Sequence, residues 1–280
     1  MENNEIILVS FNLKRDFGLP LKRSRRWRER RERAVQIIRN SKASVIGVQE
    51  LSPSMREDIA SLLGNEYSVL GNGRFQASAR KESDEHSDII IKNEDASVQF
   101  VKTFWLSKNP EKLSRAYYAM FPRICTVVEI YLYSAGRSIR IFNTHLDHIC
   151  GVARILGIEV ILQYMSRLHQ ERPMPSVLMG DFNCKPQSRP IQLLHNQVTG
   201  YPNLHLTDAY SHLPPEEIQN TLHYFRGKNK AGSMPIDYIF VSDDFEILKT
   251  HIWTDPVEGC YPSDHYPLTA TVRLKPDADH

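Results

Sequence analysis

Cysteine is scarce in this chain, and its four copies are scattered. They stand at positions 125, 150, 184 and 260 of 280 residues, and no two form a Cys-x-x-Cys pair. This usage argues against a disulfide framework or a zinc site and favours reduced thiols. Long apolar runs are also lacking, which argues against a membrane span. The sequence has no Gly-x-Ser-x-Gly elbow, no phosphate-binding loop and no dinucleotide fingerprint, so it does not indicate a serine hydrolase or a nucleotide-dependent enzyme of those types.

The N-terminal segment gives no sign of a targeting signal. Residues 1–5 are polar and acidic, and an apolar, strand-like run follows them directly. A signal peptide would need a basic start and a longer apolar stretch. Together with the reduced thiols, this predicts a cytoplasmic protein with one domain over residues 1–280, no membrane span and no evident obligate protein partner.

The chain has little net charge, only +2, so its overall field does not indicate a nucleic-acid binder. The charge is uneven, however. Residues 14–33 hold ten lysines and arginines against three acidic residues. One interpretation is a basic rim that attracts a polyanion. The other is the solvated face of an amphipathic helix whose apolar side includes Trp27, Ala34 and Ile38. Both interpretations stay open, and they are compatible.

Apolar runs alternate with helical patterns along the chain, which predicts an α/β fold. Helical periodicity covers residues 25–40, 53–63, 153–169 and 189–195. Residues 71–84 are polar and are expected to form a loop. Residues 107–123 are polar and aromatic and are expected to form a loop or a short helix over the site. The strand-like runs are residues 6–11, 43–49, 67–70, 89–91, 98–106, 124–133, 138–143, 177–179, 221–225, 236–242, 247–253 and 269–274.

Two strand–helix–strand units end in polar side chains. In the first unit the strands end at Asn12 and Glu50, and in the second they end near His145 and Asp181. Ligands of such sheets gather at the carboxyl ends of the strands. This repeated arrangement predicts two packed sheets that meet at one cleft.

The stretch Gly-Asp-Phe-Asn at residues 180–183 follows the most clearly buried strand. In extended backbone, Asp181 and Asn183 would point the same way. A carboxylate beside an amide can hold a hard cation, orient a water and bind a phosphate oxygen. The alternative is an Asx turn that merely closes a loop.

Six short motifs follow one another along the chain: Phe11-Asn12, Gln49-Glu50, Asn143-Thr-His145-Leu-Asp147, Gly180-Asp181-Phe-Asn183, Ile236-Asp237-Tyr-Ile and Ser263-Asp264-His265. In this order they resemble the endonuclease/exonuclease/phosphatase superfamily, over about residues 5–274. That resemblance implies a four-layer α/β sandwich of two packed, mixed and mostly antiparallel β-sheets flanked by helices. Residues 104–107, 122–126 and 221–223 look most similar to a bacterial branch near nocturnin and the deadenylases.

The resemblance also implies a metal site. Glu50 suits Mg²⁺ or Mn²⁺, because these ions prefer oxygen ligands and keep several waters. The run before it is buried, and an unpaired carboxylate there would be costly without a role. Asn12 and Asp264 are further candidates to hold the cation.

The catalytic candidates are acids, amides and imidazoles. Asp181 is expected to orient or deprotonate the attacking water, and Asn183 to contact a phosphoryl oxygen. By the resemblance, Asp237 would orient His265, and Glu85 would stand behind His145. The candidates to bind substrate are Asn12, Asn183, Arg115, Tyr117, Arg123, Arg154 and His223.

These residues favour a divalent-metal phosphoesterase that cleaves a phosphodiester or phosphomonoester by in-line attack of an activated water. The alternative is a catalytically silent binding or scaffold domain on the same fold. Within the enzyme interpretation, a nuclease and a phosphatase acting on a sugar, inositol or nucleotide both stay open. The loop 107–123 departs from the family pattern, and such loops select substrate.

Overall fold

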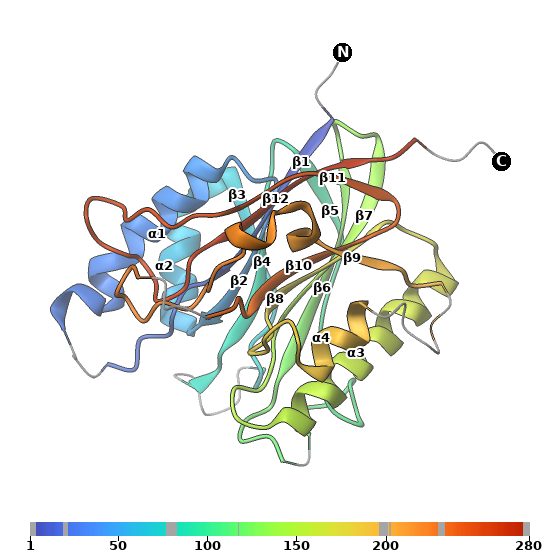
Figure 1. Ribbon diagram of the computed structural model, residues 1–280, viewed down its shortest axis with the longest axis horizontal. Helices are drawn as coiled ribbons and strands as arrows, with labels where there is room; N and C mark the ends of the chain where they lie inside the picture. The colour runs from blue at the N-terminus through green and yellow to red at the C-terminus, as the bar shows by residue number, and fades with distance from the viewer. Residues whose placement is uncertain are drawn as a thin grey trace.

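Two six-stranded sheets pack face to face in the computed structural model, with helices on both outer sides (Figure 1). The structure describes residues 4–18, 22–76, 83–116, 118–195, 201, 203–228 and 233–276. The helices are α1 (Trp27–Ser41), α2 (Pro53–Leu63), α3 (Gly151–Glu171) and α4 (Arg189–His195).

The first sheet runs in the order β11, β12, β1, β2, β4, β3. Its strands are β1 (Glu5–Asn12), β2 (Val45–Leu51), β3 (Tyr67–Leu70), β4 (His86–Lys92), β11 (Phe245–Ile252) and β12 (Leu268–Leu274). The second sheet runs in the order β5, β6, β7, β8, β10, β9. Its strands are β5 (Ala96–Trp105), β6 (Ile124–Leu132), β7 (Arg137–His145), β8 (Ser176–Asp181), β9 (Leu206–Asp208) and β10 (Asp237–Ser242).

Each sheet contains one parallel pair among antiparallel neighbours. β1 pairs with β2 in parallel, and β7 pairs with β8 in parallel. The connections are the helices α1 and α3, as parallel strands require. The predicted mixed, mostly antiparallel sandwich and its two strand–helix–strand units are therefore confirmed.

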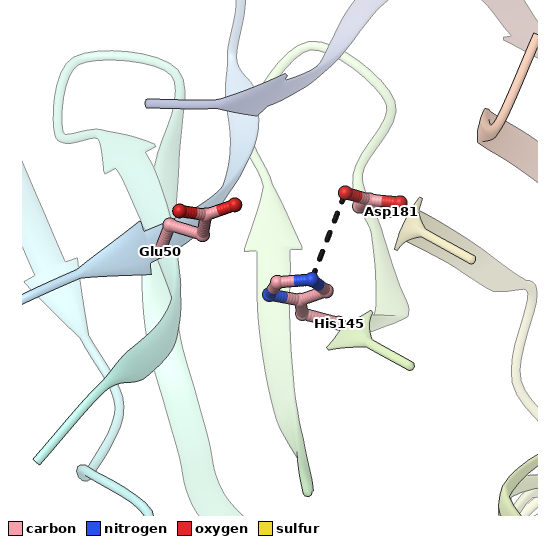
Figure 2. A group of neighbouring side chains, drawn as sticks. All are labelled: Glu50, His145 and Asp181. Atoms are coloured by element: carbon pink, nitrogen blue, oxygen red, sulfur yellow. Dashed lines mark ion pairs between the residues drawn. The ribbon is translucent and has the colours of Figure 1, made fainter. Parts of the chain in front are cut away.

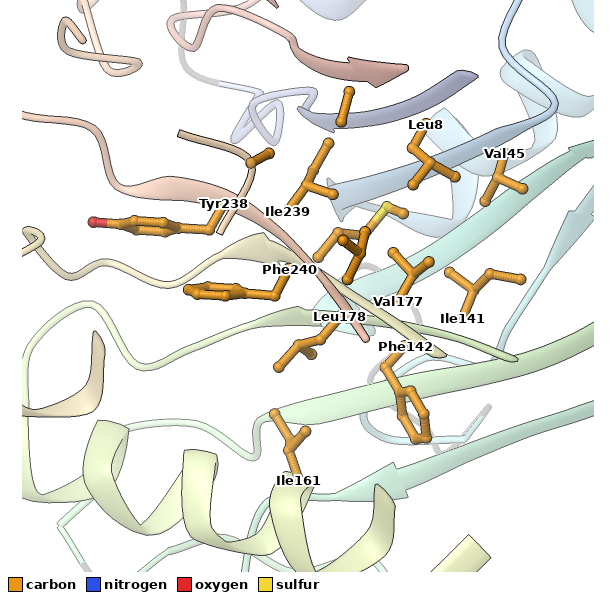
Figure 3. Close-up of a cluster of buried hydrophobic side chains, with 14 of the residues drawn as sticks. Leu8, Val45, Ile141, Phe142, Ile161, Val177, Leu178, Tyr238, Ile239 and Phe240 are labelled. Atoms are coloured by element: carbon orange, nitrogen blue, oxygen red, sulfur yellow. The ribbon is translucent and has the colours of Figure 1, made fainter. Parts of the chain in front are cut away.

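Apolar side chains from the inner faces of both sheets form the central core (Figure 3). Leu8 and Val45 of the first sheet approach Val177 and Ile239 of the second. On the outer side of the second sheet, Ile161 of α3 joins the same cluster. A separate apolar cluster lies between α1, α2 and the outer face of the first sheet. These two clusters explain why the strands read as nearly continuous apolar runs.

Local signals set the helix boundaries. Ser52 caps α2 by accepting a hydrogen bond from the Met55 amide at 3.4 Å, and Pro53 opens the helix. α1 ends at Lys42, which adopts the left-handed conformation with φ +53°. Among the described residues, no helix combines the length and the apolar character needed to cross a bilayer.

A buried polar link fixes how the two sheets face each other. Asn143 of β7 donates to the carbonyls of Val48 (2.9 Å) and Asp88 (2.7 Å), and it accepts a 2.7 Å bond from Gln49. The close approach needs Gly47, because a Cβ there would lie 2.8 Å from Asn143 Oδ1. Satisfied buried polar groups of this kind specify one arrangement of a core.

Two expectations about elements were wrong or incomplete. Residues 221–225 form no strand: only Leu222 makes an isolated bridge, to His265, and Tyr224 and Phe225 turn with φ of +54° and +58°. The short β9 was not expected, because three residues carry no clear periodicity. The described part of residues 107–123 forms a loop between β5 and β6, which is one of the two forms predicted; Tyr117 lies outside the described residues.

Candidate active site

Seven strand ends meet at one edge of the sandwich. β1, β2, β7 and β8 end there, whereas β4, β10 and β12 start there because they run antiparallel to their neighbours. The register places Asp237 directly opposite Asp181 and Leu51 opposite His86. Side chains that lie far apart in the sequence are thereby brought to one place.

Glu50 reaches this edge through an irregularity in β2. The register between β2 and β4 shifts between Gln49 and Leu51, and Glu50 itself has φ +62°. A bulge of this kind re-aims a side chain, and a non-glycine residue in this region is strained. Burial alone would raise the pKa of the Glu50 carboxyl, but Lys14 and His145 outweigh burial and hold that pKa below its usual range.

Asp181 ends β8 and closes a turn at the same time. Its Oδ1 accepts a 2.9 Å hydrogen bond from the Asn183 amide, and Asn183 has φ +49°. Asn183 is therefore not in extended backbone, and the Asx turn that was considered as the alternative is present. The turn leaves Oδ2 of Asp181 directed into the site. Burial and Asp237 raise the pKa of the Asp181 carboxyl.

Asn12 connects the two carboxylates. Its Nδ2 donates to Glu50 Oε1 at 3.1 Å and to Asp181 Oδ2 at 2.9 Å. His145 Nε2 lies 3.7 Å from the same oxygen of Asp181. Figure 2 shows this ion pair with Glu50 beside it. The predicted convergence of residues from β1, β2, β7 and β8 is thus observed.

His265 is held by an acid–imidazole pair. Its Nδ1 lies 2.8 Å from Asp237 Oδ2, and its Nε2 lies 3.8 Å from Asp181 Oδ2. Burial would lower the pKa of His265, but Asp237 and Asp181 outweigh burial and raise it to about 10. The ring is therefore an imidazolium at neutral pH, with Nε2–H directed toward Asp181.

His145 has Glu85 behind it, at 3.5 Å from Nδ1. Arg15, Arg74 and Arg123 also approach Glu85, at 3.8, 3.4 and 3.4 Å. Burial opposes ionisation of Glu85, yet His145, Arg74 and Arg123 hold its pKa far below the usual range. Arg74 was missed, because it lies in a polar loop with no motif around it. Only its distance from Glu85 in the folded protein identifies Arg74 as part of the site.

Asp264 and Lys14 complete the rim beside Glu50. Lys14 Nζ lies 3.6 Å from Glu50 Oε2 and 3.7 Å from Asp264 Oδ2. Burial raises the pKa of the Asp264 carboxyl despite His265 and Lys14. The sequence placed Lys14 only in the basic stretch 14–33, whereas the structure places its ammonium between two carboxylates.

The donor set fits a hard divalent cation. Two carboxylates and an imidazole converge in a small space, because one possible ligand atom from each of Glu50, His145 and Asp181 lies within 4.8 Å of the others. Asp237 Oδ1 and Asp264 Oδ1 are buried, and neither has a hydrogen-bond partner among the described residues. Buried acceptors without a partner are costly, so cation binding is a physical reason for such oxygens.

Two of the arginines expected to bind substrate are engaged with other groups of the protein. Arg123 is buried, with NH2 2.8 Å from His148 Nδ1 and Nε 3.7 Å from Asp147 Oδ2. Arg115 donates to the carbonyls of Ala119 and Met120, so it also shapes its own loop. Tyr117 lies outside the described residues.

Two further candidates lie close to the catalytic groups. The ring of His223 stacks on Tyr266 with centroids 4.0 Å apart, and its amide donates to the Asp264 carbonyl at 2.8 Å. Burial lowers the pKa of His223 to about 4, so the ring is neutral. Arg154 donates to the Asp147 carbonyl at 2.9 Å, and Asp147 closes the turn before α3.

The basic stretch 14–33 includes the first half of α1. In α1, Trp27, Ala34 and Ile38 are buried against the first sheet, which confirms the amphipathic helix. Arginines on the outer side of α1 and in the residues just before it line a groove of about 790 Å³, together with Glu29, Glu32 and Glu258. Arg31 and Arg33 are paired with Asp58 and Glu258, so part of this charge is already neutralised.

Comparison with known proteins agrees with this geometry. Two solved structures from Bacteroides thetaiotaomicron superpose over almost the whole chain, each with 25% identity. One, an endonuclease/exonuclease/phosphatase family protein, has a TM-score of 0.85 and coverage of 99% of this chain and 97% of its own. The other, a mannosyl-6-phosphatase, has a TM-score of 0.84 and coverage of 96% and 100%. The human nocturnin catalytic domain shares the fold, with a TM-score of 0.72, 16% identity and coverage of 97% and 95%.

A search of curated protein sequences gave no match. The model of the Endonuclease/Exonuclease/phosphatase family, in contrast, matches residues 9–265. This range runs from β1 to His265 and includes the strand ends described above. Together with the structural relatives, it supports a phosphoesterase and confirms the resemblance found in the motifs. The chain therefore belongs to the endonuclease/exonuclease/phosphatase family.

Proposed function

We propose that this protein is a divalent-metal-dependent phosphoesterase. The observation that carries the proposal is the set of groups around Asp181 Oδ2. Asn12 Nδ2 lies 2.9 Å from this oxygen, His145 Nε2 3.7 Å and His265 Nε2 3.8 Å. An acceptor, an amide donor and two imidazoles around one point match what an in-line attack on phosphorus needs: an aligned water and groups that offset developing charge.

Glu50 would hold the cation, with Asn12 and Asp264 as further ligands. Mg²⁺ or Mn²⁺ bound there would neutralise the phosphoryl oxygens and stabilise the leaving oxygen. The raised pKa of Asp181 makes its carboxylate a better base for the attacking water.

His265, charged at neutral pH, would donate from Nε2 to a phosphoryl oxygen, with Asp237 keeping the ring in place. His145, with Glu85 behind it, would donate from the other side. Asn183 donates from Nδ2 to the Leu146 carbonyl and would offer its second amide hydrogen to the same phosphoryl group. Asn12 would hold Glu50 and Asp181 in place through its two hydrogen bonds. Lys14 and Arg123 add positive charge at the rim.

The test is hydrolysis of a panel of phosphomonoesters, phosphodiesters and oligonucleotides with Mg²⁺ or Mn²⁺, with and without chelator. We expect metal-dependent turnover, and we expect Asp181→Asn to reduce kcat by about a thousandfold or more. Asp243→Asn, at an exposed turn, is the matched control and should keep full activity. Turnover that survives both the chelator and Asp181→Asn would refute the proposal.

The substrate is proposed to be a small phosphate ester. The mannosyl-6-phosphatase that resembles this chain supports this choice, as does the low net charge. The arginine-lined groove along α1 favours a second candidate, a nuclease. Binding of a nucleic acid should weaken steeply with salt, whereas binding of a small ester should change little. For each substrate, the ratio of the KM at 200 mM salt to the KM at 50 mM salt separates the two candidates.

The alternative of a catalytically silent domain is less well supported. Such domains usually lose one of the catalytic groups, whereas Glu50, Asp181, Asn183 and His265 are all present and the three with charged side chains converge. Failure of Mg²⁺ and Mn²⁺ to bind at millimolar concentration would favour it.

A further inference from the structure

Arg30 is a buried arginine that hydrogen-bonds to backbone carbonyls. Its relative exposure is 1%, although it lies on the helix α1 whose other arginines are exposed or paired. Among the described residues, no carboxylate lies within 4.0 Å of its guanidinium. Burial lowers the pKa of Arg30 to about 10, so the group still carries its charge at neutral pH. Arginine is almost never fully buried unless it is paired, so this position calls for a reason.

The guanidinium donates to four backbone carbonyls from three segments. Nε donates to Arg25 at 2.8 Å, and NH1 donates to Leu13 at 2.5 Å and Pro262 at 2.7 Å. NH2 donates to the Lys14 carbonyl. The rings of Trp27 and Phe225 lie 5.2 and 5.6 Å from its central carbon. The planar fork of arginine suits several fixed acceptors at once.

The segments that Arg30 joins carry the residues of the proposed cation site. Leu13 and Lys14 follow Asn12, and Pro262 precedes Asp264 by two residues. These segments are more than two hundred residues apart in the chain. Ser263 makes the same connection from the other side, because its Oγ donates to the Asn12 carbonyl at 2.5 Å.

We propose that Arg30 is a positioning residue, which holds the segment of Asn12 and Lys14 in fixed relation to the segment of Asp264 and His265. The inference rests on the proposed function. Among the described residues, Arg30 makes no hydrogen bond or ion pair with a site side chain, although the charges of Asp264 and Glu50 act on it through space. It acts through the backbone of both segments, so it sets the spacing between groups that must meet around one phosphoryl group.

Arg30→Lys is the informative change. It keeps the positive charge and most of the volume, but an ammonium on a flexible stem cannot span four carbonyls as the guanidinium does. We expect kcat to fall by about tenfold to a hundredfold, because small displacements of catalytic groups have effects of this size. KM for a small phosphate ester should change by less than about twofold, since Arg30 lies outside the site.

Arg140→Lys is the matched control. Arg140 is also 1% exposed, but it lies in β7 and pairs with Glu129 at 2.7 Å, far along the strand from His145. We expect it to lower the unfolding temperature about as much as Arg30→Lys does, with kcat kept within about twofold. Hydrogen exchange should speed up in both segments, residues 12–14 and 262–265, only in Arg30→Lys.

If Arg30→Lys does not yield folded protein, Ser263→Ala breaks the parallel connection and should lower kcat in the same way. Normal kcat in a folded Arg30→Lys or Ser263→Ala protein would overturn the inference and leave the proposed function in place. Absence of metal-dependent turnover in the unaltered protein would instead refute the proposed function, and the inference with it.

Discussion

The charge states of the site follow from specific neighbours of each residue. His265 is an imidazolium because Asp237 and Asp181 outweigh its burial, and Glu85 is a carboxylate because His145 and three arginines surround it. The acid–imidazole pairing of His265 was expected from the motifs, and the structure shows it at 2.8 Å. The arginines around Glu85 were not expected as a group, because Arg15, Arg74 and Arg123 come from three separate loops.

Asp237→Asn should change the pH dependence of both stability and activity. The pKa of His265 is raised from its ordinary value of 6.5 to about 10, so its pairing stabilises the fold fully below pH 6.5 and progressively less as pH rises toward 10. The variant should lose this dependence, as measured by urea unfolding at pH 6 and pH 9. As pH rises, kcat of the variant should also fall at a lower pH than kcat of the unaltered protein does. Identical unfolding profiles for the two proteins would contradict the assigned pairing.

At the scale of elements, the sequence patterns were sufficient for most strands and helices but not for the irregularities that aim the site. Helix α2 was predicted at its observed bounds, since Ser52 and Pro53 mark its start. The bulge at Glu50 could not be predicted, because it depends on how β2 pairs with β4. The turn at Asn183 was one of the two interpretations left open by the sequence, and it is closed locally by Asp181. Residues 221–225 were apolar enough to suggest a strand, yet the turn at Tyr224 and Phe225 prevails.

Gly180→Ala should be strongly destabilising. Gly180 has φ +146°, and a Cβ there would lie 2.0 Å from the Thr144 carbonyl oxygen. We expect a loss of about 3 kcal/mol or more in the free energy of unfolding, from backbone strain and the clash together. Gly259→Ala is the control, because Gly259 has φ +71° with nothing within 4 Å of the added atom, and it should lose only about 1 kcal/mol. Equal losses in chemical unfolding would show that the contact with β7 has no effect.

At the scale of the whole molecule, two sheets from distant parts of the chain bring their strand ends to one edge. The overall fold could be predicted from the resemblance of six motifs, and the family match over residues 9–265 confirms the family. The substrate could not be predicted from the sequence, since the loop 107–123 departs from the family pattern and such loops select substrate. The substrate is therefore the part of the account that depends most on experiment.

Divalent metal should stabilise the whole fold if the proposed site binds it. Ligands that bind only the folded state add about 2.7 kcal/mol at a hundred times their Kd. The unfolding temperature should therefore rise with Mn²⁺ and return to its starting value with chelator. Sodium salts of equal ionic strength are the control. An unfolding temperature that does not change with Mn²⁺ would argue against a preformed cation site.

The most direct measurement of the central claim is a calorimetric titration of Mn²⁺ into the unaltered protein, Glu50→Gln and the exposed control Glu246→Gln. Glu50 lies within the group of His145 and Asp181, whereas Glu246 lies on β11. The account predicts at least one site per chain, a Kd at least about tenfold weaker in Glu50→Gln, and an unchanged Kd in Glu246→Gln. Equal affinity in all three proteins would contradict the claim that these strand ends form a metal-dependent phosphoryl site.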